Sequence, residues 1–192
     1  MKKYRITFTH LLGIVALSVL CTLLATAQSK NPKDRVILLE NEGYTCTGVI
    51  LETNHVLTCA HCIHAIPKKY NGSTVEIEKQ DEKKDLMLVR MKTPVFERIP
   101  LADCDLSDEV YSFGHPLGER TLFYSKGYVM NVKADSIKTS LLTFPGDSGS
   151  PLFSGNRLAG LITGTVGPNR EYQPVSVTVP TTTIRSFLGW TN

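Results

Sequence analysis

The sequence consists largely of short apolar segments, rich in β-branched side chains, that are separated by turn-forming residues such as Gly, Asn and Pro. β-Branched residues favour strands, and closely spaced turn formers leave little room for long helices. In the first half of the chain the segments are 36–39, 48–51, 56–58, 74–78 and 86–90, and in the second half they are 110–113, 122–124, 128–132, 158–162 and 175–179. This pattern predicts an all-β barrel or sandwich.

A short helix is expected at the end of the chain, where Pro180 and the threonines of 181–183 precede an apolar stretch at 184–188 and Gly189 follows as a stop signal. Between the two groups of strands, a proline stands at each end of the stretch 94–100, which favours an extended connection. We therefore expect two β halves joined near residues 91–100.

The first 27 residues have the order of an export signal: basic residues at 2, 3 and 5, an apolar run over 11–24, and the small residues Ala25 and Ala27. The run is shorter than the roughly 20 residues that comfortably span a bilayer. We expect residues 1–27 to be a cleaved signal peptide and 28–192 to be one exported domain, periplasmic or extracellular. If 11–24 is not removed, it anchors the domain in the membrane.

The net positive charge of the chain comes from this leader, residues 1–27. The whole sequence has 21 Lys and Arg against 18 Asp and Glu, and residues 1–27 hold three of the basic residues and no acid, so residues 28–192 have no net charge. A nucleic-acid partner would need a basic surface on the domain. The sequence therefore predicts no nucleic-acid partner, and membrane contact only through an uncleaved leader.

Three strings carry side chains suited to catalysis. His61 follows the apolar segment 56–60, Asp85 opens the segment 86–90, and Ser148 lies in the string 144–152, which is rich in Gly, Asp and Ser. A serine is a weak nucleophile unless a histidine accepts its proton and an acid orients that histidine. Glycine before the serine lets the backbone turn so that the N–H groups of Gly146 and Ser148 converge on an oxyanion.

The order His61, Asp85, Ser148 resembles that of the chymotrypsin-like serine endopeptidases. The likeness is greatest to short bacterial trypsin-like peptidases and to the protease domain of the HtrA/Deg group, through strings at 47–50, 99–103, 114–118 and 125–129. The resemblance implies two antiparallel six-stranded β-barrels with a short C-terminal helix, action on proteins or peptides, and no cofactor. It also implies a nucleophile (Ser148), a general base (His61), an orienting acid (Asp85) and an oxyanion hole made by Gly146 and Ser148.

The sequence departs from these relatives in two respects. The residues after Trp190 leave no sequence for the PDZ module of the HtrA group, and Asp147 stands where that group usually has Asn. Digestive relatives pair this aspartate with a freed amine in an Ile/Val-Val-Gly-Gly start, which does not occur near Gln28. Asp147 is therefore expected to have another partner or none.

Four cysteines lie outside the leader. The resemblance implies a disulfide between Cys46 and Cys62, and it leaves Cys59 and Cys104 either paired with each other or free. The cluster Cys59, His61, Cys62 and His64 also has the composition of a compact zinc site, but no second ligand pair at matching spacing accompanies it, so no metal is predicted. A zinc-binding β protein and an inactive protease fold that serves as a binding module remain the alternatives.

The family resemblance places the floor of the substrate pocket at Leu142. Its walls include Thr143 and the segment holding Ile162, Thr163 and Gly164. An apolar floor favours apolar side chains and penalises an unpaired buried charge. We therefore expect cleavage after aliphatic or other uncharged apolar residues.

Overall fold

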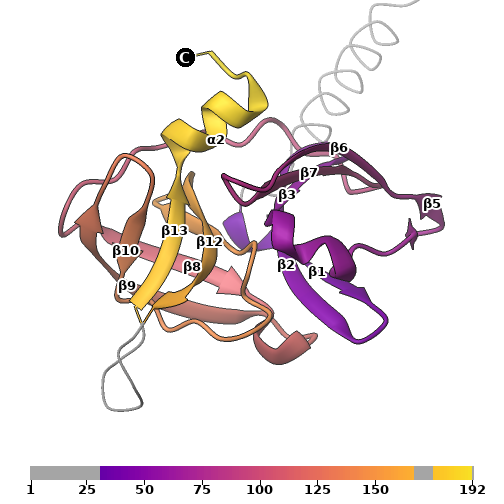
Figure 1. The fold of residues 1–192 in the computed structure, drawn as a ribbon, viewed down its shortest axis with the longest axis horizontal. Coiled ribbons are helices and arrows are strands. Elements are labelled where there is room, and N and C mark those ends of the chain that lie inside the picture. The colour runs from indigo at the N-terminus through magenta and orange to yellow at the C-terminus, as the bar shows by residue number, and fades with distance from the viewer. Residues whose placement is uncertain (1–30, 167–174, 192) are drawn as a thin grey trace, which may run out of the picture.

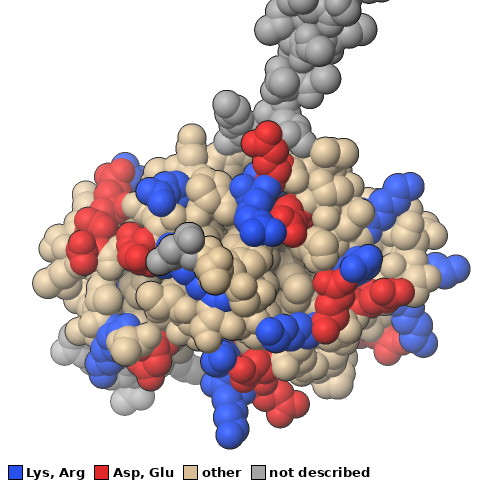
Figure 2. Space-filling view, turned by 90° about the horizontal axis from the view of Figure 1, so that it is seen from above, with Lys and Arg blue, Asp and Glu red and all other residues tan. Residues whose placement is uncertain are grey.

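The computed structural model describes residues 31–166 and 175–191, which form two β halves lying side by side (Figure 1). The expected signal peptide, 1–27, lies outside the described residues. Within the described part of the chain, no helix is both long and apolar enough to cross a membrane. On the face seen in Figure 2, acidic and basic side chains are interspersed over the surface.

The N-terminal half is an antiparallel five-stranded sheet in the order β1-β2-β3-β7-β6. Its strands are β1 (Val36–Asn41), β2 (Tyr44–Glu52), β3 (His55–Thr58), β6 (Glu76–Asp81) and β7 (Leu86–Arg90). Two short 3-10 helices accompany the sheet, η1 (Pro32–Arg35) before β1 and η2 (Ala60–Ala65) after β3.

This half is not the closed six-stranded barrel that the sequence led us to expect. The chain between η2 and β6 forms β4 (Lys69–Tyr70) and β5 (Ser73–Thr74), which pair with each other in a separate two-stranded sheet. Strands of two residues offer too few backbone groups to bridge β1 and β6, and the exposed side chains of β6 give that edge little apolar surface to cover. The sheet therefore stays open among the described residues.

The C-terminal half is a closed barrel of six strands in the order β10-β13-β12-β11-β8-β9. The elements are β8 (Glu109–Gly114), the 3-10 helix η3 (Pro116–Gly118), β9 (Phe123–Val132), β10 (Ile137–Thr139), β11 (Pro151–Ser154), β12 (Arg157–Val166) and β13 (Val175–Pro180). The two segments expected at 122–124 and 128–132 are one strand, β9. The expected trypsin-like, mostly β architecture is confirmed, with this half as its closed barrel.

The expected C-terminal helix is also confirmed. Helix α2 (Thr181–Leu188) ends at Gly189, which has φ +71° and so adopts the left-handed conformation that glycine tolerates. The helix buries Ile184 and Phe187, and the backbone carbonyl of Phe187 accepts a hydrogen bond from Lys79 on β6. Helix α2 therefore ties the barrel to the N-terminal sheet.

One hydrophobic core cluster spans the two halves, and a second one lies within the closed barrel. Buried side chains of the N-terminal sheet, such as Leu57 and Met87, belong to the same cluster as Phe153, Leu161 and Phe187 of the C-terminal half. Residues 91–100 cross between the halves without helix or strand, and Ile99 N–H donates to the Leu51 carbonyl at 2.7 Å. The shared core holds the loops at the junction in fixed relative positions.

Candidate active site

His61 and Asp85 meet at the ends of neighbouring strands. His61 lies in η2, just after β3, Asp85 comes immediately before β7, and β3 pairs with β7. Asp85 has φ +53°, a left-handed conformation uncommon for a residue with a side chain. Its carboxylate lies 2.8 and 3.0 Å from His61 Nδ1, and one oxygen also accepts the His61 backbone N–H at 3.0 Å.

This contact sets the chemistry of the imidazole. The Asp85 hydrogen bond raises the pKa of His61 above its ordinary value, although partial burial of the ring opposes the shift. A carboxylate that accepts from Nδ1–H favours the tautomer with a bare Nε2. The pair can therefore take up a proton at Nε2 and stabilise the resulting imidazolium.

Ser148 lies in the loop between β10 and β11, which approaches the N-terminal half. Its backbone carbonyl accepts a hydrogen bond from Thr47 N–H at 2.8 Å, which joins the loop to β2. The same carbonyl lies 3.8 Å from the sulfur of Cys62, the residue after His61. The Ser148 backbone, from the C-terminal half, is thus held against β2 and near the residue that follows His61 in the N-terminal half.

The loop around Ser148 is a series of tight turns. Asp147 N–H donates to the Phe144 carbonyl at 3.0 Å, and Ser150 N–H donates to the Asp147 carbonyl at 2.9 Å. Gly149 has φ +88°, and a Cβ there would lie 2.0 Å from the Thr47 carbonyl oxygen. Only glycine fits this close approach, which brings the residue after Ser148 against β2.

The N–H groups of Gly146 and Ser148 have no hydrogen-bond partner among the residues that the structure describes. The carbonyls of the same two peptide groups, those of Pro145 and Asp147, accept from Leu117 N–H at 2.6 Å and Ser150 N–H at 2.9 Å. In a trans peptide the N–H points opposite to the carbonyl. Both N–H groups are therefore oriented by bonds on the other side of their peptide planes and remain available to an anion.

Asp147 has a local partner. Its side chain accepts the backbone N–H of Phe144 at 2.9 Å, and the residue is 7% exposed. Burial raises the pKa of Asp147 to about 6, against a smaller lowering by this hydrogen bond. No ion pair with a cationic group is formed by this carboxylate within the described residues.

The structure contains a disulfide between Cys46 and Cys62, with Cα atoms 6.1 Å apart. Cys59 and Cys104 are free and buried. Burial raises the pKa of the Cys59 thiol well above its usual value and that of Cys104 to about 11, so both sulfurs stay protonated. They are poor nucleophiles and poor metal ligands in this state.

A metal site at the histidine has some geometric basis. Ligand atoms of Cys59, His61 and Asp85 all lie within 4.8 Å of one another. However, the Cys59 S–H donates to the Ile162 carbonyl, His61 and Asp85 are hydrogen-bonded to each other, and Cys62 is in the disulfide. His64, the other residue of the suggested zinc cluster, packs its ring on Tyr44. These partners weigh against zinc.

The residues expected to line the substrate pocket differ in how far their side chains are exposed. Leu142 is 52% exposed, and Thr143 is buried with its hydroxyl 2.7 Å from that of Thr165. Ile162 is 1% exposed and packs in the core of the closed barrel, so its side chain does not face solvent. Its neighbour Thr163 is half-buried, and nothing lies within 4 Å of the Cβ position of Gly164. Leu142 and Gly164 are thus the expected pocket residues with open space beside them.

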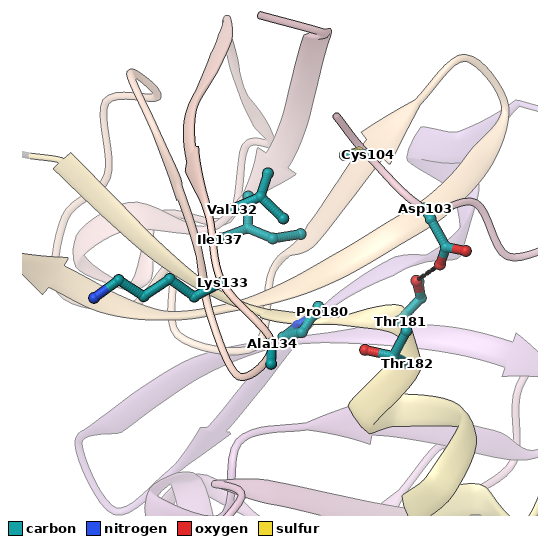
Figure 3. A pocket seen from close by; sticks show the side chains of 9 residues that line it. All are labelled: Asp103, Cys104, Val132, Lys133, Ala134, Ile137, Pro180, Thr181 and Thr182. Atoms are coloured by element: carbon teal, nitrogen blue, oxygen red, sulfur yellow. Dashed lines mark hydrogen bonds between the residues drawn. The ribbon is translucent and has the colours of Figure 1, made fainter. Parts of the chain in front are cut away.

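A separate cavity of about 340 Å³ lies in the C-terminal half (Figure 3). It is lined by residues of the β9–β10 turn, the segment around Cys104 and the start of α2, where Thr181 bonds Asp103. None of His61, Asp85 and Ser148 lines it. We therefore do not assign it to the site around Ser148.

Sequence reasoning assigned no role to Thr47 or His115. Both lie in strings that carried the family resemblance, but the bonds of Thr47 to His115 N–H and to the Ser148 carbonyl depend on how the two halves meet. A buried threonine beside a disulfide cysteine gave no signal of its own in the sequence.

A curated relative supports the protease interpretation. Over 167 residues the chain is 26% identical to "Protease Do-like 4, mitochondrial" from Arabidopsis thaliana, an alignment that covers 74% of this chain and 31% of that protein. The chain spans about a third of the length of the curated relatives that it matches.

Two solved structures have the same fold. The serine endoprotease from Yersinia pestis matches with a TM-score of 0.69 at 18% identity, over 85% of this chain and 66% of that one. The inactive form of Rv3671c from M. tuberculosis H37Rv, a serine-to-alanine mutant, matches with a TM-score of 0.67 at 13% identity, over 82% and 86% of the two chains. At these identities the likeness shows the fold.

The family itself is shown by sequence. The family model of the trypsin-like peptidase domain matches residues 46–161, which is more than half of the chain and includes His61, Asp85 and Ser148. The open sheet, the closed barrel and the short C-terminal helix agree with that match. The chain belongs to the trypsin-like peptidase domain family.

Proposed function

We propose that the protein is an exported serine endopeptidase that works through a triad of Ser148, His61 and Asp85. The observation that carries the proposal is the contact of Asp85 with His61 Nδ1 at 2.8 Å. A loop of the other half carries Ser148 and two N–H groups that have no hydrogen-bond partner within the described ranges. Family membership supports peptide-bond hydrolysis of protein or peptide substrates. Export is supported by the composition of residues 1–27 and by a disulfide, which persists in oxidising compartments.

In the first chemical step, Ser148 Oγ attacks the carbonyl carbon of the peptide bond as His61 Nε2 takes the hydroxyl proton. The carbonyl oxygen becomes an oxyanion, which accepts from the N–H groups of Gly146 and Ser148. Asp85 keeps the ring oriented and stabilises the imidazolium. His61 then gives its proton to the leaving amine, the C–N bond breaks, and an acyl-enzyme ester remains on Ser148.

In the second chemical step, water is the nucleophile and Ser148 Oγ is the leaving group. His61 takes a proton from water as the oxygen attacks the ester carbonyl, and the oxyanion again lies at Gly146 and Ser148. Return of the proton to Ser148 Oγ releases the carboxylic acid product. No atom outside the chain, the substrate and water is needed.

Replacement of the nucleophile tests this proposal. Ser148→Ala is expected to abolish hydrolysis of labelled casein and reaction with a fluorophosphonate probe, while the melting temperature stays within a few degrees because Ser148 is not in the core. The control is Ser136→Ala in the exposed β9–β10 turn, which keeps both activities. Casein hydrolysis by Ser148→Ala at the wild-type rate would refute the serine mechanism, and an inactive wild type would favour a binding module.

The proposed export is tested separately. The full chain is expressed in a bacterial host, the cells are fractionated, and the N-terminus of the purified protein is determined. A start at Gln28 in the periplasm or medium is expected. A cytoplasmic protein that starts at Met1 would contradict export without touching the proposed chemistry.

A further inference from the structure

Thr47 lies where three segments of the site meet. It is on β2, directly after the disulfide cysteine Cys46, and it is fully buried. The Ser148 loop packs on it from the C-terminal half, and the turn at His115 approaches it after β8. A polar side chain at 0% exposure has a free-energy cost unless its hydrogen bonds are made.

The Thr47 hydroxyl makes two hydrogen bonds across the junction of the halves. Its Oγ1 donates to the Gly146 carbonyl at 2.9 Å and accepts from the His115 N–H at 3.1 Å. Thr47 N–H also donates to the Ser148 carbonyl at 2.8 Å. One residue thus binds the carbonyls of both amino acids whose N–H groups face the expected oxyanion.

These bonds matter because Gly146 has no side chain to fix its backbone. Gly146 has φ +97°, which glycine reaches without strain but also leaves easily. The backbone conformation of Gly146 is therefore fixed by the orientation of the two peptide planes that flank it. Leu117 N–H holds the plane before Gly146 through the Pro145 carbonyl, and Thr47 holds the plane after it through the Gly146 carbonyl.

The atoms packed around Gly146 restrict the movement of its carbonyl. A Cβ on Gly146 would lie 2.5 Å from the His115 carbonyl oxygen, so the two loops are already in close contact. The Thr47 carbonyl in turn accepts from Thr58 Oγ1 at 2.7 Å, which fixes β2 at this point. Loss of the Thr47 hydroxyl would leave the Gly146 carbonyl and His115 N–H buried without this partner. Rotation of the Gly146–Asp147 peptide would relieve that cost, and the freed glycine could then also tilt the preceding peptide, which carries the Gly146 N–H.

We propose that Thr47 is a positioning residue whose hydroxyl, by holding the Gly146 carbonyl, keeps the Gly146 N–H aimed at the oxyanion of the reaction. The inference rests on the proposed serine peptidase mechanism. It predicts a role in the transition state rather than in substrate binding, because the oxyanion is absent from the bound substrate.

The test compares three variants with the wild type. Thr47→Val keeps the branched shape and removes the hydroxyl, whereas Thr47→Ser keeps the hydroxyl. Thr181→Val is the matched control, since Thr181 is also a buried threonine with a hydroxyl bonded to two oxygens, those of Ala102 and Asp103, at the start of α2. Labelled casein gives kcat and KM, and a peptide aldehyde serves as a mimic of the tetrahedral oxyanion.

For Thr47→Val we expect kcat to fall by about tenfold or more, less than the roughly 10²–10³-fold loss that follows removal of a whole oxyanion donor, with KM within about twofold of wild type. Affinity for the aldehyde falls by the same factor as kcat. Thr47→Ser retains kcat within about threefold. Thr181→Val loses thermal stability but keeps kcat and aldehyde affinity, which separates positioning from general destabilisation.

Two outcomes overturn the inference. A folded Thr47→Val with wild-type kcat shows that the hydroxyl does not position Gly146, and equal losses of kcat in Thr47→Val and Thr181→Val show that only stability was lost. These results leave the proposed function intact if the wild type hydrolyses casein. A wild type that neither hydrolyses casein nor reacts with a fluorophosphonate overturns the proposed function and this inference with it.

Discussion

Asp147→Asn is expected to stabilise the protein at neutral pH. Asp147 is a buried carboxylate whose described partner is the Phe144 N–H, and among the residues that the structure describes it forms no ion pair. The amide oxygen of asparagine can accept the same N–H, but it carries no charge. The substitution therefore removes the cost of burying the charge and keeps the hydrogen bond.

The magnitude follows from the pKa of Asp147, which burial raises from 3.8 to about 6. Well below pH 3.8 the carboxyl is protonated in both the folded and the unfolded chain, so its charge has no effect. As the pH rises to 6, the unfolded chain loses this proton more readily than the folded one, and the free energy of unfolding decreases. Two pKa units correspond to at most about 3 kcal/mol.

The assay is thermal unfolding of the wild type and Asp147→Asn between about pH 3 and pH 8. We expect nearly equal melting temperatures near pH 3, and above pH 6 a variant that is more stable by up to roughly 6–12 °C, at about 2–4 °C per kcal/mol for a domain of this size. A difference that does not grow between pH 4 and pH 7, or a variant less stable at pH 8, would refute the reasoning.

Asp103→Asn supplies a control of opposite sign. Hydrogen bonds from Thr181 and Arg185 lower the pKa of Asp103, so its charge stabilises the folded chain above the unfolded pKa and that contribution is lost as the pH falls. This variant is expected to be less stable than wild type at neutral pH and to approach it in acid. The two aspartates thus distinguish a local electrostatic effect from a general effect of Asp→Asn.

Three further predictions concern the disulfide, the acid and the substrate pocket. Cys46→Ala combined with Cys62→Ala should lower stability by about 3 kcal/mol, from closure of a loop with a sequence separation of 16, and a reductant should destabilise the wild type but not the double variant; recovery of both thiols free from oxidised wild type would contradict this. Asp85→Asn should lower kcat by roughly 10⁴-fold and remove the upward shift of the His61 pKa, and an NMR titration of the imidazole would check the second effect. A larger loss of kcat in Asp81→Asn or Asp103→Asn would show that another acid orients His61. Profiling of cut sites in a peptide library should show aliphatic or other uncharged apolar residues before the cleaved bond, and a dominant charged residue would refute Leu142 as the pocket floor.

Several strands were predictable because they depend on local side chains. β-Branched runs bounded by turn formers coincide with β1, β3 and β7, and the Pro180 to Gly189 signals coincide with α2. The fusion of two segments into β9 was not predictable, because Ser125, Lys126 and Gly127 are poor strand formers that pair with β8 in the folded chain. Pairing across the barrel overrides local preference there.

Barrel closure was beyond the sequence for a different reason. Whether the first and last strands of a sheet meet depends on the length of the intervening hairpins and on the tilt of every strand between them. The family resemblance implied six strands in each half. Beside its five-stranded sheet, the described part of the N-terminal half has the two-residue strands β4 and β5, which pair only with each other. The segment 74–78, expected as one strand, is divided between β5 and β6 at Val75.

The candidate site, like the fold, could be predicted from the sequence only in part. His61, Asp85 and Ser148 carry chemistry that a sequence string can indicate, and the strand pairing of β3 with β7 brings the first two together. The partner of Asp147 was left open, since a backbone N–H three residues away is as available to an aspartate as a distant cation. Only the turn at 144–147 decides between them.

The site as a whole depends on contacts that neither half can make alone. His61 and Asp85 come from the N-terminal half, and Ser148 comes from the C-terminal half. At the site the two halves are joined by hydrogen bonds from Thr47 to the carbonyls of Gly146 and Ser148. The close approach of Gly149 to the Thr47 carbonyl and the core that contains both Leu57 and Phe153 hold the same junction. Because packed cores yield in discrete steps rather than gradually, a small displacement of one half would break several of these bonds together. The geometry at Ser148 is therefore a property of the assembled halves, which is why residues remote from any catalytic string, such as Thr47, bear on it.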